Sequence, residues 1–227
     1  MPDLTLASAV HAAARQLADA GVSDPLVDAE LLAGHVLGLR RGEVQAVIIR
    51  GDAVEEADAD SLRALVTRRA GREPLQHITG TAPFRHLELA VGPGVFVPRP
   101  ETETVVQYAI DALLGSALPA PIGIDLGTGS GAIALAMATE VPHARVFATE
   151  LSPDAYPWAV RNTAGVDNLT LVNEDLAHAF PELDGTASVV ISNPPYVPDA
   201  AVPRDPEVRL FDPVSYTHLR AHETGRN

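Results

Sequence analysis

Short apolar runs and helical stretches alternate along residues 121–191, and this alternation constrains the fold more than any other feature of the chain. The pattern predicts strands at 121–126, 145–149, 169–172 and 187–191, and helices at 131–140 and 153–164. Strands that are joined through helices by short loops form a mostly parallel, doubly wound sheet. Because ligands of such sheets lie outside the carboxyl ends of the strands, we expect an α/β domain with its site at that edge.

A glycine-rich loop follows the first expected strand. Its cofactor-binding candidates are Asp125, Gly127, Thr128, Gly129 and Gly131. Glycines at alternate positions allow a sharp turn and a close backbone approach, and the next helix offers free N–H groups at its start. The spacing G-x-G-x-G departs from the dinucleotide pattern, and a carboxylate at 125 would repel a pyrophosphate but accept hydrogen bonds from an ammonium group. The loop therefore favours S-adenosylmethionine over a nicotinamide dinucleotide.

Carboxylates also end the next two expected strands. Glu150 follows the second strand, where its carboxylate can accept from both hydroxyls of a ribose. Asp175 follows the third strand, within expected reach of an adenine amino group. Each residue alone also fits a carboxylate that only caps the next helix. Their common register with the glycine loop favours cofactor binding.

The fourth expected strand ends in a stiff turn, Asn193, Pro194, Pro195 and Tyr196. The two prolines fix the backbone, so the Asn193 side-chain oxygen and the Pro194 carbonyl can converge beyond the strand end. Two acceptors suit a substrate group that carries two N–H donors, and we expect Asn193 to border the cofactor as well. The alternative is a strand-terminating turn with Tyr196 packed as a lid.

The N-terminal residues 1–72 predict a small helical domain. Apolar residues recur at helical spacing from Leu6 to Leu17, and Gly21 is the expected stop. Ser23 is the expected N-cap of a second helix through residue 37, and a further helix runs over 60–69 after an acidic loop or helix start. This domain carries no catalytic pattern, so its expected role is packing or interaction.

Residues 73–97 predict a β-hairpin connector, because the helical period breaks there and loose alternation with glycine and proline follows. A helix then begins near Glu101 and can form one wall of a pocket. Arg99 and Glu101 fit either a local salt bridge or contacts to a ligand.

Composition excludes several classes of function. The 227 residues are 46% hydrophobic, enough for a buried core, and the formal net charge is −14, which disfavours direct binding of nucleic acid. No run is long enough to cross a bilayer, and residues 1–3 lack the charged-then-apolar layout of a secretory signal, so we expect a cytoplasmic protein. There is no cysteine, and the eight histidines lack paired ligand spacing, so we expect no metal site.

Four motifs together resemble one family. They are Glu-Pro-Leu-Gln-His-Ile-Thr-Gly at 73–80, Val-Pro-Arg-Pro-Glu-Thr-Glu at 97–103, the loop and helix at 125–136, and Ser-Asn-Pro-Pro-Tyr at 192–196. In this order they resemble the release factor glutamine N5-methyltransferases, the HemK/PrmC family, through about residue 213. Asn-Pro-Pro-Tyr is shared with other amino-group methyltransferases, whereas the Arg-Pro-Glu-Thr-Glu segment is much narrower.

The resemblance implies methyl transfer from S-adenosylmethionine to the side-chain amide of a glutamine in peptide chain release factors. It implies a Rossmann-like methyltransferase domain at 98–213 and a helical domain at 1–72 that grips the protein substrate. The implied catalytic residues are Asn193, Pro194 and Tyr196, and the implied substrate contacts are these three with Pro195, Arg99 and Glu101. An amide nitrogen is a poor nucleophile, so the acceptors at 193 and 194 would orient it, while Tyr196 would pack on the planar amide or only on its hydrophobic surroundings.

Two other functions stay open. The first is an N6-adenine DNA methyltransferase with the same Asn-Pro-Pro-Tyr site, which the net charge and the lack of a basic or aromatic target-recognition stretch disfavour. The second is a cofactor-binding fragment without catalysis.

The end of the chain departs from the family pattern. The apolar alternation ceases after residue 213, where a sheet of about seven strands would continue, so the strand before Asn193 would be an open edge. We hypothesise that residues 214–227 are foreign sequence joined to a truncated gene; the alternative is a native disordered tail. The oligomeric state stays undetermined.

Overall fold

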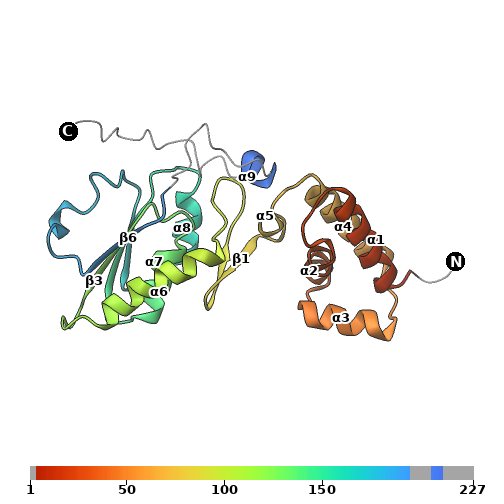
Figure 1. Cartoon of the computed structure of the whole chain (residues 1–227), viewed down its shortest axis with the longest axis horizontal. Coiled ribbons are helices and arrows are strands. Elements are labelled where there is room, and N and C mark those ends of the chain that lie inside the picture. Colours follow the sequence, from red (N-terminus) through yellow and green to blue (C-terminus); the bar gives the residue numbers. More distant parts are fainter. Residues whose placement is uncertain (1–3, 195–205, 212–227) are drawn as a thin grey trace. The chain divides into compact units, whose positions relative to one another are not determined.

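The computed structural model describes residues 4–194 and 206–211, which divide into two compact units with the boundary between Thr79 and Gly80 (Figure 1). Pro195, Tyr196 and the predicted foreign segment 214–227 lie outside the described residues. In the part of the chain that the structure describes, no helix combines the length and apolarity that a bilayer span requires.

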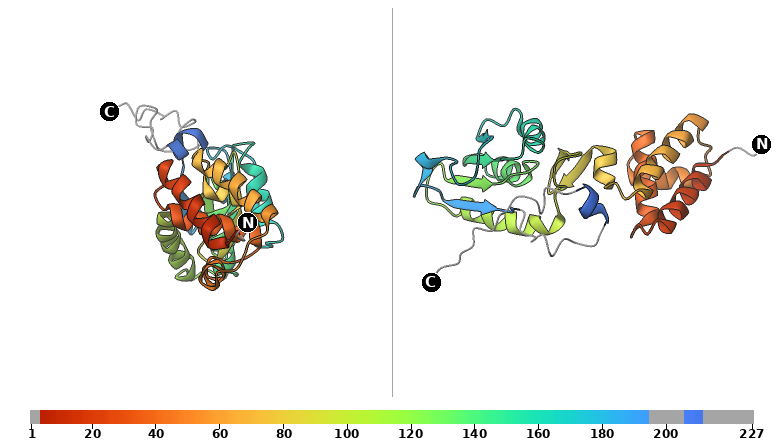
Figure 2. Two further views of the ribbon diagram at one scale, coloured as in Figure 1. Left: turned by 90° about the vertical axis from the view of Figure 1, so that its right-hand side faces the viewer. Right: turned by 90° about the horizontal axis from the view of Figure 1, so that it is seen from above.

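The first unit is a bundle of helices (Figures 1 and 2). Its elements are α1 (Leu6–Asp19), α2 (Pro25–Leu37), α3 (Arg41–Arg50), α4 (Glu56–Ala70) and α5 (Leu75–Thr79). The apolar stripe of α1 packs against α2 and α4, and Val10, Leu17 and Leu32 are fully buried. The Thr5 hydroxyl accepts from the Ser8 amide at 3.2 Å and caps α1. The helical unit that the sequence predicts is therefore present.

Several local boundaries in this unit differ from the predicted ones. The N-cap of α2 is Asp24 and not Ser23. α4 begins at Glu56, because acidic residues in a first turn are stabilised by the helix dipole, so the acidic stretch is mostly helix. The break expected at 73–80 contains α5, which buries Ile78 in the core of the first unit. The helical unit thus extends beyond residue 72 to Thr79.

The second unit begins with an antiparallel hairpin and continues into an α/β domain. Its elements are β1 (Thr81–Phe84), β2 (Leu87–Ala90), α6 (Pro100–Leu114), β3 (Ile122–Leu126), α7 (Ala132–Glu140), β4 (Arg145–Thr149), α8 (Tyr156–Thr163), β5 (Leu169–Val172), the 3₁₀ turn η1 (Pro181–Leu183), β6 (Val189–Ser192) and α9 (Pro206–Phe211). The hairpin is shorter than the predicted 73–97, because only β1 and β2 pair.

The four strands β3 to β6 form one parallel sheet in the order β5-β4-β3-β6. The predicted doubly wound sheet is therefore confirmed. The strand order reverses direction between β3 and β6, since β4 and β5 lie to one side of β3 and β6 to the other. In open α/β sheets, this switch point is where a crevice for ligands forms.

Apolar packing covers both faces of the sheet. On one face, α6, α7 and the hairpin share a buried core with the strands. α6 and α7 press closely on β3, because a Cβ at Gly123 would lie 3.3 Å from both Leu113 Cδ1 and Met137 Sδ. On the other face, Phe147 and Phe180 meet edge to face, with ring centroids 5.2 Å apart. Packing on both faces thus fixes the sheet, and with it the positions of the strand ends.

Candidate active site

The four strands of the sheet end level with one another. Parallel pairing aligns Val172 with Thr149, Thr149 with Leu126, and Leu126 with Ser192. The residues that follow these ends are Asn173, Glu150, Gly127 and Asn193. Neighbouring strands lie about 4.8 Å apart, so these four positions form a short row along one edge. Gly127 and Asn193 follow the two strands that flank the switch point.

The glycine loop has the backbone conformation that its glycines predict. Gly127, Gly129 and Gly131 all have positive φ angles, of 76°, 60° and 85°. The amides of Gly127 and Thr128 both donate to the Thr149 carbonyl at 2.9 Å, which ties the turn to β4. A Cβ at Gly127 or Gly129 would meet nothing within 4 Å. The loop thus leaves open space above its backbone.

Asp125 lies beneath the loop and is completely buried. Its Oδ2 accepts from the Thr128 hydroxyl at 2.5 Å and from the Ala134 amide at 3.1 Å. Its Oδ1 has no hydrogen-bond partner among the described residues. Burial raises the pKa of Asp125 from 3.8 to about 7, against the two hydrogen bonds and with a small contribution from the Glu150 charge. This carboxyl therefore changes its charge near neutral pH.

Glu150 joins the end of β4 to the glycine loop. Its side chain is nearly buried, Oε2 accepts from the Gly129 amide at 2.8 Å, and Oε1 accepts from the Ser152 amide at 2.8 Å. Each carboxylate oxygen keeps a further lone pair for another donor. The Asn173 side chain donates to the Glu150 carbonyl at 2.6 Å and fixes the neighbouring strand end. The acceptor predicted for ribose hydroxyls is thus held rigidly beside the loop.

Asp175 is exposed, and its Oδ1 accepts from the Ala177 amide at 2.9 Å. This is a local hydrogen bond within a turn, whereas the alternative that the sequence left open was a cap of the next helix. Contact with an adenine ring stays a prediction.

Asn193 and Pro194 follow β6 directly, and the Ser192 hydroxyl donates to the Leu126 carbonyl at 2.6 Å. The Asn193 side chain is exposed and Pro194 is partly buried. The structure thus brings Asn193 to the same edge as Asp125, Glu150 and the glycine loop. Pro195 and Tyr196 lie outside the described residues, and the roles predicted for all four stay predictions.

Arg99 and Glu101 lie at the start of α6. Arg99 occupies the N-cap position, and its guanidinium carbon lies 5.0 Å from the centroid of the Phe96 ring, which is a cation–π contact. Glu101 is exposed in the first turn. Their predicted contacts with a ligand stay predictions.

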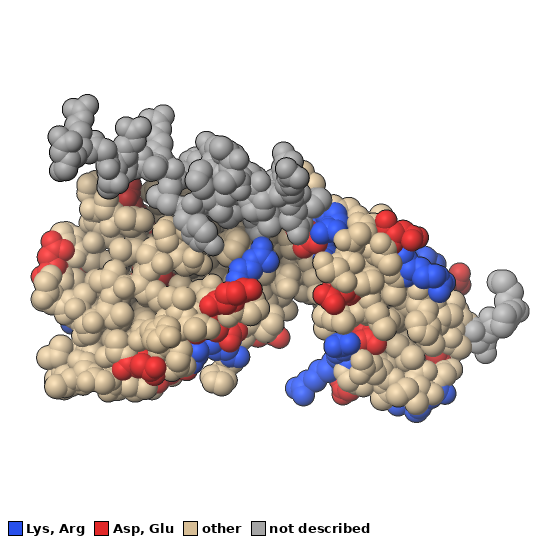
Figure 3. Space-filling model, viewed as in Figure 1, with Lys and Arg blue, Asp and Glu red and all other residues tan. Residues whose placement is uncertain are grey.

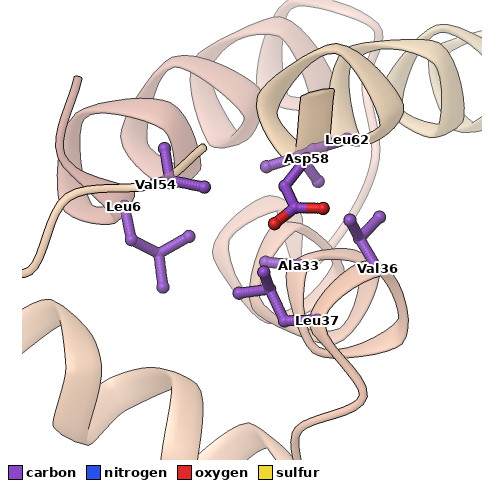
Figure 4. A pocket seen from close by; sticks show the side chains of 7 residues that line it. All are labelled: Leu6, Ala33, Val36, Leu37, Val54, Asp58 and Leu62. Atoms are coloured by element: carbon purple, nitrogen blue, oxygen red, sulfur yellow. The ribbon is translucent and has the colours of Figure 1, made fainter. Parts of the chain in front are cut away.

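Two depressions lie in the first unit, away from these residues in the chain. Leu6, Ala33, Val36, Leu37, Val54, Asp58 and Leu62 line a narrow crevice, in which Asp58 is the one charged side chain among the described lining residues (Figure 4). A wider groove of about 210 Å³ is lined by residues of α1 and α4, including the small side chains Ala9, Ala12 and Ala13. Neither depression includes a residue that we predict to bind the cofactor.

Sequence reasoning missed Asn162, Asn173 and Thr149, which brace the site. The Thr149 hydroxyl donates to the Glu174 carbonyl at 2.6 Å, and Asn162 in α8 donates to the carbonyls of Ala90 and Ser130. The Ala90 partner is 72 positions away in the chain. No pattern among neighbouring residues indicates such contacts.

The residues at this edge fit S-adenosylmethionine. The open space above Gly127 and Gly129 admits a ligand against the backbone. The unpartnered Asp125 Oδ1 and the remaining lone pairs of Glu150 match the ammonium and ribose donors of that molecule.

Comparison with known proteins gives the same family along the chain. The model of the PrmC N-terminal domain matches residues 8–80, and the model of the methyltransferase small domain matches residues 103–219. A release factor glutamine methyltransferase of Streptomyces coelicolor is 51% identical over 215 residues, which cover 91% of this chain and 74% of the relative. The protein of the same name in Bifidobacterium longum is 43% identical, and the match covers 90% of this chain and 73% of the relative. That of Mycolicibacterium smegmatis is 46% identical, and the match covers 92% of this chain and 72% of the relative.

These matches extend across both units, and the fold and the glycine loop agree with a methyltransferase that uses S-adenosylmethionine. The chain therefore belongs to the release factor glutamine methyltransferase family.

Proposed function

We propose that the chain transfers a methyl group from S-adenosylmethionine to the side-chain amide nitrogen, N5, of a glutamine in peptide chain release factors, in the cytoplasm. One observation carries the proposal for the site. Asn193 follows β6 and the glycine loop follows β3, so the amide-binding candidate and the cofactor loop flank the switch point of the sheet.

Asp125, Glu150 and the glycine loop would hold the cofactor. The loop leaves room against its backbone, Glu150 would accept from the ribose, and Asp125 Oδ1 would accept from the ammonium group. When bound, S-adenosylmethionine supplies an electrophilic methyl group on a sulfonium. Asp125 must be ionised to attract a cation, so cofactor affinity would increase as the pH rises through about 7.

Asn193 and Pro194 would orient the glutamine amide. The Asn193 Oδ1 and the Pro194 carbonyl would each accept one N–H of the amide, which aims its nitrogen into the site. The same two acceptors stabilise the positive charge that develops on the nitrogen during alkylation. The transfer needs no strong base to deprotonate the amide beforehand. The sequence neighbours of Asn193, Ser192 and Pro194, are not bases.

The helical unit would contact the protein substrate. We propose the groove of α1 and α4 for this contact, because its small alanine side chains leave space for the side chains of a partner. The hairpin at 81–90 would connect this unit to the methyltransferase domain that begins near residue 98.

Charge supports a protein substrate over DNA. The net charge is −14, and on the face drawn in Figure 3 the described arginines are interspersed with acidic side chains. Binding to a phosphate backbone needs clustered cations.

A competition assay tests the proposal. The full chain is incubated with radiolabelled S-adenosylmethionine, a release factor and duplex DNA in one reaction. We expect label in the release factor, mass spectrometry that locates it on one glutamine, and no label when that glutamine is replaced by alanine. Label in the DNA, or in neither macromolecule, would overturn the proposed substrate.

A further inference from the structure

One side chain of α8 joins three separate parts of the second unit. Asn162 Oδ1 accepts from the Ala90 amide at 2.8 Å, and Asn162 Nδ2 donates to the Ala90 carbonyl at 2.9 Å. Nδ2 also donates to the Ser130 carbonyl in the glycine loop at 2.8 Å. The amide thus pairs with the end of strand β2 as a neighbouring strand would, and uses its remaining hydrogen to hold the loop.

The chemistry of these contacts is specific to asparagine. The arrangement needs one acceptor and two donors on a short planar group, and an asparagine amide supplies them. Aspartate has the same shape, but as a carboxylate it has no donor and would face the carbonyls of Ala90 and Ser130. A substitution to aspartate therefore removes two hydrogen bonds and adds repulsion, while it keeps the volume of the side chain.

The hydrogen bond to Ser130 constrains the loop through the planarity of the peptide group. The Ser130 carbonyl and the Gly131 amide belong to one rigid plane, so a fixed carbonyl direction also fixes the N–H direction. The Gly131 amide donates to the Thr128 carbonyl at 2.9 Å and closes the turn of the loop. Asn162 therefore holds the turn in which Gly129 lies.

Close packing leaves little room for α8 to move relative to either partner. A Cβ at Gly131 would lie 3.2 Å from Thr163 Cγ2, and one at Gly92 would lie 2.6 Å from the Trp158 ring. Trp158 also donates from its indole nitrogen to the Pro93 carbonyl at 3.3 Å. α8 thus contacts the glycine loop and the segment after the hairpin without a gap.

We propose that Asn162 is a positioning residue that sets the conformation of the cofactor loop and couples it to the hairpin. The inference rests on the proposed function in one respect, that the loop at 127–131 binds S-adenosylmethionine. One amide group holds both Ala90 and Ser130, so a displacement of strand β2 would alter the backbone conformation of the loop at 127–131. By the same coupling, a ligand bound to the loop would stabilise the hairpin.

The chain offers a matched control in Asn168. Its Nδ2 donates to the carbonyls of Ala138 at 3.0 Å and Ala144 at 3.1 Å. Asn168 thus also bridges backbone carbonyls in the same unit, but at the end of α7 that is distant from the glycine loop. Loss of either asparagine is expected to lower thermal stability by a similar amount, so stability alone does not distinguish them.

The experiment compares Asn162→Ala, Asn162→Asp and Asn168→Ala in the full chain. Amide hydrogen exchange without ligand is expected to increase at residues 127–131 and 81–91 in both Asn162 variants, and to stay at the parent level there in Asn168→Ala. Calorimetric titration with S-adenosylhomocysteine is expected to show affinity about tenfold weaker for Asn162→Ala and unchanged for Asn168→Ala. If Asn162→Ala does not fold, hydrogen exchange in Asn162→Asp gives the comparison, because aspartate keeps the volume of the side chain and the acceptor for the Ala90 amide.

The two readouts separate the inference from the proposed function. Equal exchange at 127–131 in the Asn162 and Asn168 variants would overturn the positioning role. Affinity for S-adenosylhomocysteine that falls equally in both would overturn it as well. If the parent chain itself does not bind S-adenosylhomocysteine, the proposed cofactor site is wrong, and the exchange comparison still decides whether Asn162 sets the loop.

Discussion

Two residues of opposite character lie at the ends of adjacent strands at the candidate site, Asp125 in β3 and Asn193 directly after β6. Asp125 on β3 is fully buried and one of its oxygens has no partner among the described residues, whereas Asn193 after β6 is exposed. A bound cation stabilises the ionised form of a buried carboxyl group, while an exposed amide is available to bind a second molecule. In the proposed function, Asp125 would therefore serve cofactor binding and Asn193 would serve substrate orientation.

Replacement of Asn193 by alanine is expected to remove turnover and leave cofactor binding nearly intact. The variant lacks the side-chain acceptor for the glutamine amide, and orientation by such acceptors typically contributes a factor of about 100 or more in rate. Turnover is measured with a release factor, and affinity by titration with S-adenosylhomocysteine. Equal loss of affinity and turnover would contradict the assignment. The control is Ser188→Ala, at the opposite end of the β6 segment. Its affinity for S-adenosylhomocysteine is expected to match that of the parent.

Asp125 is expected to make stability depend on pH. Its pKa is raised from 3.8 to about 7 in the folded state, so between these values the folded chain binds more protons than the unfolded chain. The contribution of Asp125 to the free energy of unfolding therefore decreases as the pH rises from about 4 to about 7. Asp125→Asn is expected to remove this decrease.

Urea unfolding of the parent and of Asp125→Asn at pH 5 and pH 8 measures the difference. Asp175→Asn serves as the control, because its carboxyl is exposed at the same sheet edge. If the free energy of unfolding changes equally with pH in the parent and in Asp125→Asn, the buried carboxyl does not titrate in this range.

Among the elements, the hairpin β1–β2 is anchored by its tip. Arg85 occupies a left-handed conformation, with φ of 53°, in the turn between the strands. Its guanidinium pairs with Glu140 at the end of α7, with 2.7 Å from Nη2 to Oε2, and donates to Gln107 in α6 at 2.8 Å. The hydrogen bond from Arg85 lowers the pKa of Glu140. The hairpin is thus fixed at its tip by Arg85 and at its base by Asn162.

Loss of the Arg85 anchor is expected to destabilise the second unit. Arg85→Ala removes a partly buried ion pair, with side chains 13% and 22% exposed, so the expected cost is about 2 kcal/mol, between that of an exposed pair and that of a buried one. Arg85→Lys is expected to restore little, because an ammonium lacks the planar fork that contacts two partners. Arg63→Ala, which breaks an exposed pair with Asp60, is the control, expected within about 0.5 kcal/mol of the parent. Chemical unfolding measures all three, and an Arg85→Ala variant as stable as Arg63→Ala would refute the anchor.

In the whole molecule, the two units have separate hydrophobic cores. The first core is braced by a buried ion pair, with 2.6 Å from Arg69 Nε to Asp28 Oδ2 and side chains 7% and 11% exposed. Separate cores indicate that each unit unfolds as its own cooperative transition.

Asp28→Asn is therefore expected to lower the stability of one unit alone. The change removes the carboxylate from a buried arginine, at a cost of about 3 to 5 kcal/mol. Scanning calorimetry is expected to show one transition at a lower temperature and the other unchanged, and affinity for S-adenosylhomocysteine is expected to equal that of the parent. A variant in which both transitions shift together would contradict independent units. Asp60→Asn in the same unit breaks only an exposed pair and is the control.

The sequence by itself determined the type of fold and the residue types at the site. The strands expected at 145–149 and 169–172 are β4 and β5 with the same limits, because alternation of apolar runs and helical stretches is set by near neighbours. The glycines at 127, 129 and 131 predicted a sharp turn for the same local reason, and the structure gives all three a positive φ angle. Once the strands are known to be parallel, their carboxyl ends must lie along the same edge of the sheet.

Only the tertiary structure decided which of these groups are buried, held or left without a partner. Asp125 is fully buried in a strand that lies between β4 and β6, and it accepts a hydrogen bond from α7. The contacts of Asn162 join positions 32 and 72 residues apart. The extent of α5 likewise depends on the core that receives Ile78. Local pattern records the preference of a segment for helix, strand or turn, whereas burial and long-range hydrogen bonds depend on which distant segments pack against it.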